Sequence, residues 1–444
     1  MDQTDQAETA RTPSTTSHEQ SALPAAQRHD PYHALRFRDF RLYFLAVFLS
    51  SIGEQMLSVA IGWELYQRTN SALALGMVGL VQVLPVMLLS LFTGSLADRV
   101  NRKRMMLGAQ VLFAVSSLGL LILSYLQGPL WMIYACLLLS GIAASFSGPV
   151  SSALLSQTVP ESAYENAATW ESSSWQLASV GGPALSGLLI ALFHYATPIF
   201  AVNVVAIAIV ILCVALLRAD YRPRKQETSA EKVSTLRSLA DGLRFLRGSQ
   251  VLLAAITLDL FAVLLGGATT LMPIFARDIL RAGPTGLGLL QAAPSVGALC
   301  MTLLMAHTPP FKKAGRTLLL AVAAFGLVTC VFGLSPFFWL SLLSLALLGA
   351  MDNVSVVIRS TLLLTRTPDE MRGRVASVNA LFISMSNQLG GFESGIAAQL
   401  LGPIGAVVAG GLGTMLVVSL IAVCWPEMRR LGSLSEPTHP ESAS

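Results

Sequence analysis

Charged residues are scarce in this 444-residue chain. Lys, Arg, Asp and Glu together make up 12% of it, whereas hydrophobic residues make up 53%. A soluble domain carries about twice that charged fraction, so the composition excludes an ordinary soluble protein, and the mean hydropathy of +0.63 agrees. The chain instead offers many apolar runs of the roughly 20 residues that a membrane-spanning helix needs, separated by short basic, glycine-containing or proline-containing breaks.

Residues that would support metal, disulfide or nucleotide chemistry are also few. The five cysteines lie scattered in apolar runs, so we expect neither disulfides nor a metal cluster, and the six histidines show no ligand spacing. No phosphate-binding loop of the G-x-x-x-x-G-K-[ST] type occurs, and no nucleophile is paired with a base. We therefore expect no enzyme activity, no cofactor and no direct use of ATP. The net charge of +4 comes from loops, which argues against nucleic acid as a partner.

The apolar runs divide the chain into two sets of six spans, which predicts an all-α polytopic membrane protein. The predicted parts are a disordered cytoplasmic tail over 1–34, a first six-helix bundle over 35–218, a cytoplasmic linker over 219–250, a second bundle over 251–425 and a cytoplasmic tail over 426–444. The twelve predicted spans are 42–67, 75–97, 105–126, 130–157, 164–193, 197–217, 251–276, 284–306, 316–334, 337–363, 373–401 and 404–425.

The basic residues predict how the spans are oriented. Of the 29 Lys and Arg residues, the twelve-span arrangement places 25 on one side, Arg68, Arg277 and Arg281 on the other, and Arg359 within a span. Because short basic loops stay in the cytoplasm, both termini are predicted to be cytoplasmic. Leucines at helical spacing in the linker predict a short helix there, which either lies along the inner membrane surface or packs under the bundle.

The second half of the chain repeats the first. The stretch from Gly79 to Pro85 matches Gly288 to Pro294 at an offset of 209 residues, and Gly141 falls on Gly349 at an offset of 208. A parallel repeat of six spans implies two bundles related by an axis along the membrane normal, with a transport site between them near the midplane. Gln82 and Gln291 occupy equivalent places in the first match, and we regard both as candidates for the substrate cavity.

A basic loop between the second and third spans carries the most specific motif. It reads G-S-L-A-D-R-V-N-R-K-R over 94–104 and closely resembles the signature loop of the major facilitator superfamily of secondary transporters, with Asn101 where that loop usually has glycine. The resemblance implies an inner gate in which Asp98 contacts the positive end of the eleventh span near 372–375. Its residues would be Gly94, Asp98, Arg99, Arg102 and Lys103.

Ionisable residues within spans are costly and need partners or a function. Glu54, near the middle of the first span, is the leading candidate for proton coupling, and Asp259 in the seventh is the second. The alternatives for such a residue are a hydrogen-bonded structural carboxylate or a substrate contact. Asp352 and Arg359 lie on one face of the tenth span and are predicted to form a mainly structural charge pair.

Other polar residues of the spans have narrower predicted roles. Glu64 is four residues before Arg68, a spacing that favours an ion pair. Glu171, flanked by two tryptophans that include Trp175, is a candidate contact for a cationic or aromatic substrate. The tryptophans serve equally well as interface or packing residues.

The fifth span contains a helix-packing motif, Gly182-Pro183-Ala184-Leu185-Ser186-Gly187. Small residues permit close helix contact and Pro183 favours a kink, which predicts a hinge or a leak-sealing contact, or else a simple packing notch. G-P-x-x-x-G resembles a reduced form of a motif found in exporters of the superfamily. The fourth-span arginine typical of many drug and proton antiporters is missing, since that span has no charge.

Several further stretches resemble the enterobactin-exporter-like branch of the superfamily: F-R-L-Y-F over 40–44, S-A-L-A-L-G-M-V-G over 71–79 and P-D-E-M-R-G-R-V over 368–375. The resemblance implies a monomer in the bacterial inner membrane that exports a small amphipathic compound, such as a siderophore, a macrolide or a drug, in exchange for protons. An importer of a small polar solute is the alternative, and a non-transporting receptor or scaffold is a third.

Overall fold

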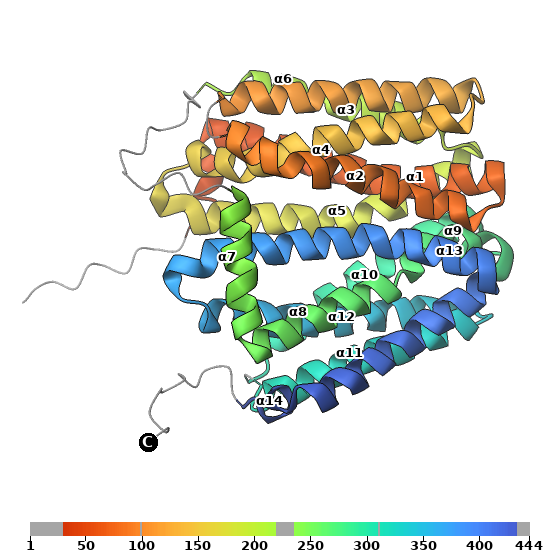
Figure 1. Cartoon of the computed structure of the whole chain (residues 1–444). Helices are drawn as coiled ribbons and strands as arrows, with labels where there is room; N and C mark the ends of the chain where they lie inside the picture. The colour runs from red at the N-terminus through yellow and green to blue at the C-terminus, as the bar shows by residue number, and fades with distance from the viewer. Residues whose placement is uncertain (1–29, 98–99, 219–234, 310, 433–444) are drawn as a thin grey trace, which may run out of the picture.

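The computed structural model describes residues 30–97, 100–218, 235–309 and 311–432, and every regular element in these ranges is helical (Figure 1). Eleven of the described helices are long and apolar enough to cross a membrane. One of them, α13 (Asp369–Cys424), consists of two spans joined at Gly402, whose φ of 77° and ψ of 162° break the helix before Pro403. The described chain therefore has the twelve spans predicted from the sequence, including the break predicted between residues 401 and 404.

The first bundle contains six long helices. They are α1 (Arg38–Thr69), α2 (Ala72–Ala97), α3 (Arg102–Tyr125), α4 (Leu130–Thr158), α5 (Tyr164–Phe193) and α6 (Thr197–Ala215). Short 3₁₀ turns, η1 (Ala34–Arg36) and η2 (Glu161–Ala163), precede α1 and α5. Pro85 and Pro183 lie inside α2 and α5, where the neighbouring helices support the helix despite the lost hydrogen bonds.

The second bundle begins with a broken span. It runs through α8 (Gln250–Leu265), η3 (Ala268–Leu271), α9 (Met272–Ile274) and the π-helical turn η4 (Phe275–Ile279). The remaining spans are α10 (Gly283–Ala306), α11 (Ala314–Leu334), α12 (Phe338–Arg366) and the two parts of α13, followed by the short α14 (Pro426–Arg430). The sequence predicted one apolar run here and did not predict the break after Leu265.

Equivalent helices of the two bundles make equivalent contacts. In the first bundle α4 packs on α2 and α3, and in the second α12 packs on α10 and α11. Gly141 of α4 lies against the backbone of Gln82 on α2, and Gly349 of α12 lies against the backbone of Pro294 on α10. A side chain at either glycine would collide with the facing helix, so the repeated glycines have the same packing function in both halves.

The two bundles meet along two helix pairs, α2 with α13 and α5 with α10. We call the end of the molecule where residues 30 and 432 and α7 lie the terminal end, and the other the opposite end (Figure 1). One hydrophobic cluster at the opposite end contains residues of both bundles, among them Leu65, Leu75 and Leu287. At the terminal end the clusters are separate, one made of residues 34–217 and one of residues 246–431. The bundles thus share a core at one end only.

The linker helix α7 (Thr235–Gly248) lies across the terminal end (Figure 1). It packs mainly on α13: Gly242 lies against the backbone of Arg374, and Arg374 Nη1 is 3.4 Å from Asp241 Oδ2. Of the two predicted placements of this helix, the structure therefore has the one packed on the bundle.

The described part of the N-terminal segment begins before the predicted start of the first bundle. Asn166 Nδ2 and Trp170 Nε1 donate to Pro31 O at 2.8 and 3.0 Å, so residues from about 31 pack on the start of α5. The predicted boundary at residue 34 falls inside this contact, and residues 1–29 lie outside the described chain. At the other terminus, α14 packs on α11 and Ala314 N donates to Gly432 O at 3.1 Å.

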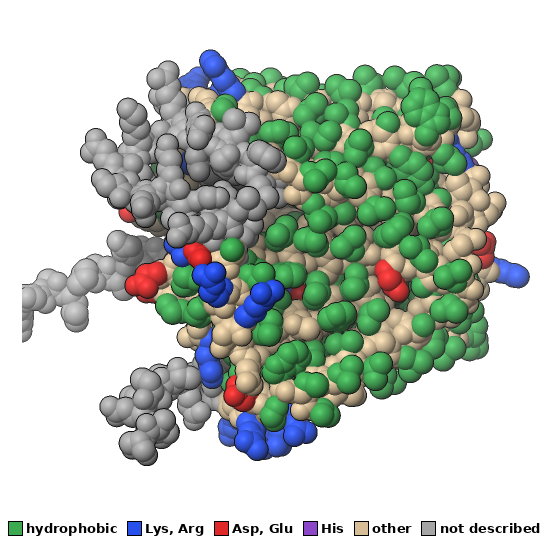
Figure 2. Space-filling model, viewed as in Figure 1, with side chains coloured by type: hydrophobic (Ala, Val, Ile, Leu, Met, Phe, Trp, Pro, Cys, Tyr) green, Lys and Arg blue, Asp and Glu red, His purple; other side chains and the backbone are tan. Residues whose placement is uncertain are grey.

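Hydrophobic side chains cover the flank of the helices in Figure 2, whereas most Lys, Arg, Asp and Glu side chains lie at the two ends. Several of the outward leucines are more than half exposed, including Leu88, Leu320 and Leu400 at 62%, 70% and 77%. A belt of this kind is unfavourable in water and suits contact with lipid chains.

Candidate transport site

The packing motif of α5 lies where the two bundles touch. Gly182 faces α1, because a Cβ there would be 2.6 Å from Gln55 Cβ. Gly187 faces α10, because a Cβ there would be 2.9 Å from Gly288 Cα, and Gly288 in turn faces the backbone of Pro183. The three motif residues therefore place α5 in close contact with its own bundle and with the second bundle at once.

The other inter-bundle pair, α2 with α13, has the same construction. A Cβ on Gly76 would lie 3.0 Å from Gly395 Cα, and one on Gly79 would lie 2.7 Å from Gln388 O. Both glycine contacts are in the half of the molecule toward the opposite end. Backbones that approach this closely leave no room for a solute between them.

Toward the terminal end the same helix faces are uncovered. On α13, Ser384 and Ser377 precede Gly395, which faces α2, by eleven and eighteen residues and are both exposed. On α5, Ser173 is fourteen residues before Gly187, which faces α10, and is also exposed. Residues separated by eleven, fourteen or eighteen positions lie on nearly the same face of a helix. We call the boundary between the bundles, formed by α2 with α13 and by α5 with α10, the seam. The helix faces that close the seam at the opposite end therefore diverge at the terminal end.

Glu54 lies in the middle of α1 and its side chain is exposed. Helix α1 packs on α5 and α6 of its own bundle and on α9 and α10 of the other, so it is an interior helix. Glu54 makes no hydrogen bond or ion pair with any residue that the structure describes. An exposed carboxylate on an interior helix is expected to face the space between the bundles rather than lipid.

Glu171 has local partners within the first bundle. Tyr43 Oη donates to Glu171 Oε1 at 3.0 Å and also lies 3.0 Å from Ser151 Oγ. The neighbouring Trp170 packs on Tyr32 and Phe44, with ring centroids 6.0 and 5.7 Å apart. Of the two tryptophans beside Glu171, Trp170 is thus a packing residue, whereas Trp175 is 58% exposed.

Asp352 and Arg359, the predicted charge pair, interact electrostatically but do not form a direct ion pair. Arg359 forms its ion pair with Asp259 of α8. Both side chains are buried, with residue exposures of 4% and 7%. A spacing of seven residues separates two side chains by about 10 Å along a helix, which is beyond the reach of an ion pair, whereas α8 brings Asp259 directly against α12. This pair is also why Asp259 differs from Glu54, which has no such partner in the described chain.

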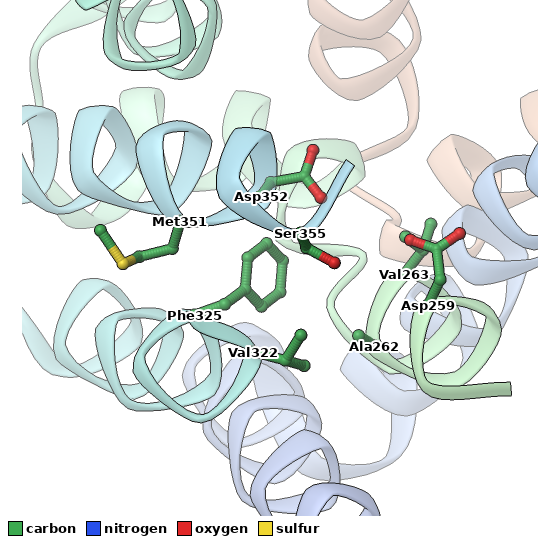
Figure 3. Close-up of a pocket in the computed structure, with 8 residues that line it drawn as sticks. All are labelled: Asp259, Ala262, Val263, Val322, Phe325, Met351, Asp352 and Ser355. Carbon is green, nitrogen blue, oxygen red and sulfur yellow. The ribbon is translucent and has the colours of Figure 1, made fainter. Parts of the chain in front are cut away.

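Asp352 lines a small pocket together with Asp259 and Ser355 (Figure 3). Phe325 of α11 forms an apolar wall of the same pocket. Its volume is about 10 Å³, close to the space that a single water molecule requires. Asp352 interacts electrostatically with both Asp259 and Arg359. The predicted pair is thus part of a three-residue charged group with two carboxylates and one guanidinium.

The two glutamines predicted to line the cavity are half-buried. Neither Gln82 nor Gln291 makes a side-chain hydrogen bond with the part of the chain that the structure describes. They belong to α2 and α10, the helices that carry the inter-bundle glycines. Both stay candidates for contact with a solute.

The signature loop is described only in part, because Asp98 and Arg99 lie outside the described residues, and with them the contact predicted between Asp98 and the start of α13. Gly94 is in the last turn of α2 and Arg102 is the first residue of α3. Asn101 Oδ1 accepts a hydrogen bond from Arg104 N at 3.2 Å, so it caps α3.

Lys103 Nζ donates to Ala215 O and Leu217 O at the end of α6, at 2.7 and 2.6 Å. A cation at a helix C-terminus is favourable, and this one fixes the loop to the first bundle.

Two polar groups lie at the opposite end. Glu64 and Arg68 form the predicted ion pair, which is thereby confirmed, and Ser124 Oγ donates to Glu64 Oε2 at 2.8 Å. The second group joins Tyr66 and Asn70 of the first bundle to η4 of the second. This second group was not predicted from the sequence. The one feature of the sequence that points to it is that two of the few basic residues on that side, Arg277 and Arg281, follow the seventh span.

Comparison with known proteins identifies the family. The family model described as transmembrane secretion effector matches residues 29–441. The chain belongs to this family of the major facilitator superfamily. Among its relatives are macrolide efflux protein A of Streptococcus pyogenes, 24% identical over 83% of this chain and 92% of that protein, and the enterobactin exporter EntS of Shigella flexneri, 28% identical over 88% and 92%. The multidrug efflux pump Tap of Mycolicibacterium fortuitum is 26% identical over 89% of this chain and 98% of its own.

Solved transporters have the same fold as this secretion effector chain. A crystal structure of the POT family transporter PepTSo covers 88% of this chain and 98% of its own with a TM-score of 0.68 at 13% identity. A crystal structure of the nucleoside transporter NupG covers 88% and 99% with a TM-score of 0.64 at 13% identity. The chain is therefore a multi-pass membrane transporter with the major facilitator fold.

Proposed function

We propose that this transporter exports a small amphipathic organic compound from a bacterium by alternating access, in exchange for protons. The observation that carries the proposal is the one-sided core: the bundles share a hydrophobic cluster at the opposite end and have separate ones at the terminal end. The efflux proteins and the enterobactin exporter among the relatives support the outward direction.

The distribution of basic residues supports the orientation. Lys and Arg gather in the loops of the terminal end, so by the positive-inside rule that end and both termini face the cytoplasm. The seam that diverges at the terminal end is then open to the cytoplasm, which is the state in which an exporter loads its substrate. Rocking of the bundles about the site between them would separate the shared core and open the site to the outside.

Glu54 is the proposed coupling residue. A carboxylate in a low-dielectric interior favours its neutral form, and a group without a fixed partner can take up and release a proton as its exposure changes. Asp259 is the second candidate, but in the observed state its ion pair with Arg359 stabilises the charged form of the Asp259 carboxylate. Asp352, which has no ion pair within the described residues, is the control carboxylate of that group.

Substrate contact is proposed for the exposed Trp175 of α5 and for the half-buried Gln82 of α2 and Gln291 of α10, all on helices that take part in the contacts between the bundles. An aromatic ring with two amides suits an amphipathic molecule better than a sugar or a small anion. Glu171 would join them only if it leaves Tyr43. The loop over 94–104 is the proposed inner gate, with Lys103 as its anchor on the first bundle.

The test uses inside-out membrane vesicles with an acid interior and a pH-sensitive dye. Macrolides, catecholate siderophores and amphipathic cations are added to vesicles that contain wild type, Glu54→Gln, Asp259→Asn or Asp352→Asn. The proposal predicts compound-dependent proton release in wild type that is lost in Glu54→Gln and retained in Asp352→Asn. Release that survives in Glu54→Gln and is lost in Asp259→Asn would transfer the role to Asp259.

The alternatives give different results in the same vesicles. An importer would transport a polar solute and would not transport the macrolides, siderophores and amphipathic cations. A receptor or scaffold would give no proton flux with any compound. Either result would contradict the proposed export.

A further inference from the structure

Four residues join the two bundles at the opposite end. Tyr66 is in the last turn of α1 and Asn70 ends that helix in a left-handed conformation with a φ of 49°. Arg277 and Asp278 are in η4 of the second bundle. We call these four residues the outer latch. They are 207 to 212 positions apart in the chain, and every contact between the two pairs crosses from one bundle to the other.

The contacts of the outer latch are mutual. Tyr66 Oη donates a hydrogen bond to Asp278 Oδ2. In the other direction, Arg277 Nη1 donates to Asn70 Oδ1 at 2.8 Å and to Tyr66 O at 3.4 Å, and its guanidinium is 5.4 Å from the centroid of the Tyr66 ring. A charge-assisted hydrogen bond and a cation–π contact therefore supplement the apolar packing beneath them.

The charged half of the latch is open to water. The side chains of Arg277 and Asp278 are 36% and 48% exposed, and Arg277 Nε is 3.8 Å from Asp278 Oδ1. Exposed ion pairs contribute little to stability because water and salt compete for both partners. On the partner side, Tyr66 is buried at 6% exposure, whereas Asn70 is exposed. Hydrogen bonds between such groups hold the two bundles together, but they are readily replaced by hydrogen bonds to water.

A neighbouring charged pair makes its hydrogen bonds within one bundle rather than between the two. Glu64 and Arg68 are one turn apart on α1, on either side of Tyr66 in the sequence, and their hydrogen bonds go to residues of the first bundle, such as Ser124 and Gly128. That group moves with its own bundle and does not resist separation. The outer latch is the group whose bonds must break when the bundles part at this end.

We propose that the outer latch holds the opposite end closed and that its strength sets how often this end opens. The role of the latch in releasing substrate rests on the proposed function, but the closure itself does not. When the bundles rock, the hydrogen bonds of Tyr66 and Arg277 exchange for bonds to water, which lowers the barrier to outward opening.

The test measures opening without any substrate. A variant in which Ala or Ser replaces the five native cysteines carries one reporter, Ala72→Cys. Ala72 is 7% exposed, and its carbonyl oxygen would lie 3.0 Å from a Cβ on Gly395, so it is at the seam. Intact cells are treated with a membrane-impermeant maleimide, and the labelling rate reports how often water reaches the seam from outside.

Tyr66→Phe, Asp278→Asn and Arg277→Gln are each expected to raise the labelling rate about tenfold. Two matched controls remove the same groups at the same end: Tyr195→Phe, where the tyrosine is 67% exposed, and Arg281→Gln. Both controls are expected to label as slowly as the reporter parent.

A double variant separates the latch from general damage. Tyr66→Phe with Asp278→Asn removes the two partners of one bond, so its rate should equal that of either single variant rather than the product of the two effects. Rates in Tyr66→Phe and Arg277→Gln that equal the parent, or a double variant whose effects multiply, would overturn the proposal. A chain that moves no tested compound but shows the expected labelling would overturn the proposed function and leave the latch intact.

Discussion

Substitution of Gly187 by alanine should open the molecule at the opposite end. A Cβ at Gly187 would lie 2.5 Å from Pro284 O and 2.9 Å from Gly288 Cα, and these are backbone atoms that cannot rotate away. Restoring an ordinary contact requires that α5 and α10 separate by about 1 Å. A Cβ at Gly181, on the same helix, would have no facing atom within 4 Å, so Gly181→Ala supplies the matched control.

The size of the shift from closed to open molecules depends on the free energy of this clash. Overpacking of a tight contact costs about 1 to 3 kcal/mol, and the cost applies only when the seam is closed at this end. The ratio of closed to open molecules should therefore fall about 5- to 150-fold. If the closed state is favoured by a similar free energy in wild type, the variant would occupy the outward-open state to a large extent.

Pulsed electron spin resonance measures this shift. Spin labels at the exposed Tyr195 and Thr285 report the distance between α5 and α10 at the opposite end in a variant without native cysteines. Gly187→Ala should move the distance distribution to longer values, and Gly181→Ala should leave it unchanged. A folded Gly187→Ala protein with the parent distribution would refute the assignment of this contact to the closed seam.

Three further predictions concern stability, measured as the thermal unfolding midpoint in detergent. Asp259→Asn leaves the guanidinium of Arg359 buried without its ion partner and should cost about 3 to 5 kcal/mol, most of which the double change with Arg359→Gln should restore; no recovery would contradict the pairing. Tyr43→Phe removes the donor to Glu171 and should cost about 1.5 to 3 kcal/mol, so an unchanged midpoint would count against that bond. Gly402→Ala places a side chain at a φ of 77° and should cost about 1 to 3 kcal/mol, and a neutral effect would argue against the observed break.

The span pattern could be predicted from the sequence because it depends on local properties. Apolar run length, the Gly402-Pro403 break and the four-residue spacing of Glu64 and Arg68 are all read along the chain, and the structure has each of them. The repeat was visible for the same reason, since Gly141 and Gly349 must be small for one packing contact made twice.

Partners from other helices could not be predicted in this way. Periodicity shows which face a residue occupies but not which helix faces it. Arg359 was therefore assigned to Asp352 on its own helix, although the neighbouring α8 presents Asp259. Tyr43 with Glu171 and the outer latch are also long-range contacts, between residues 128 and 207 or more positions apart. A single sequence contains no signal for such pairs.

The most direct test of the account is transport into liposomes that contain only this protein, oriented with the terminal end outward. A radiolabelled macrolide is added outside, with the interior either acid or at the external pH. The account predicts accumulation against the concentration gradient when the interior is acid, and only equilibration when there is no pH gradient. Accumulation that is the same with and without the pH gradient would contradict proton exchange. If none of the compounds transported by the relatives enters the liposomes, export is contradicted.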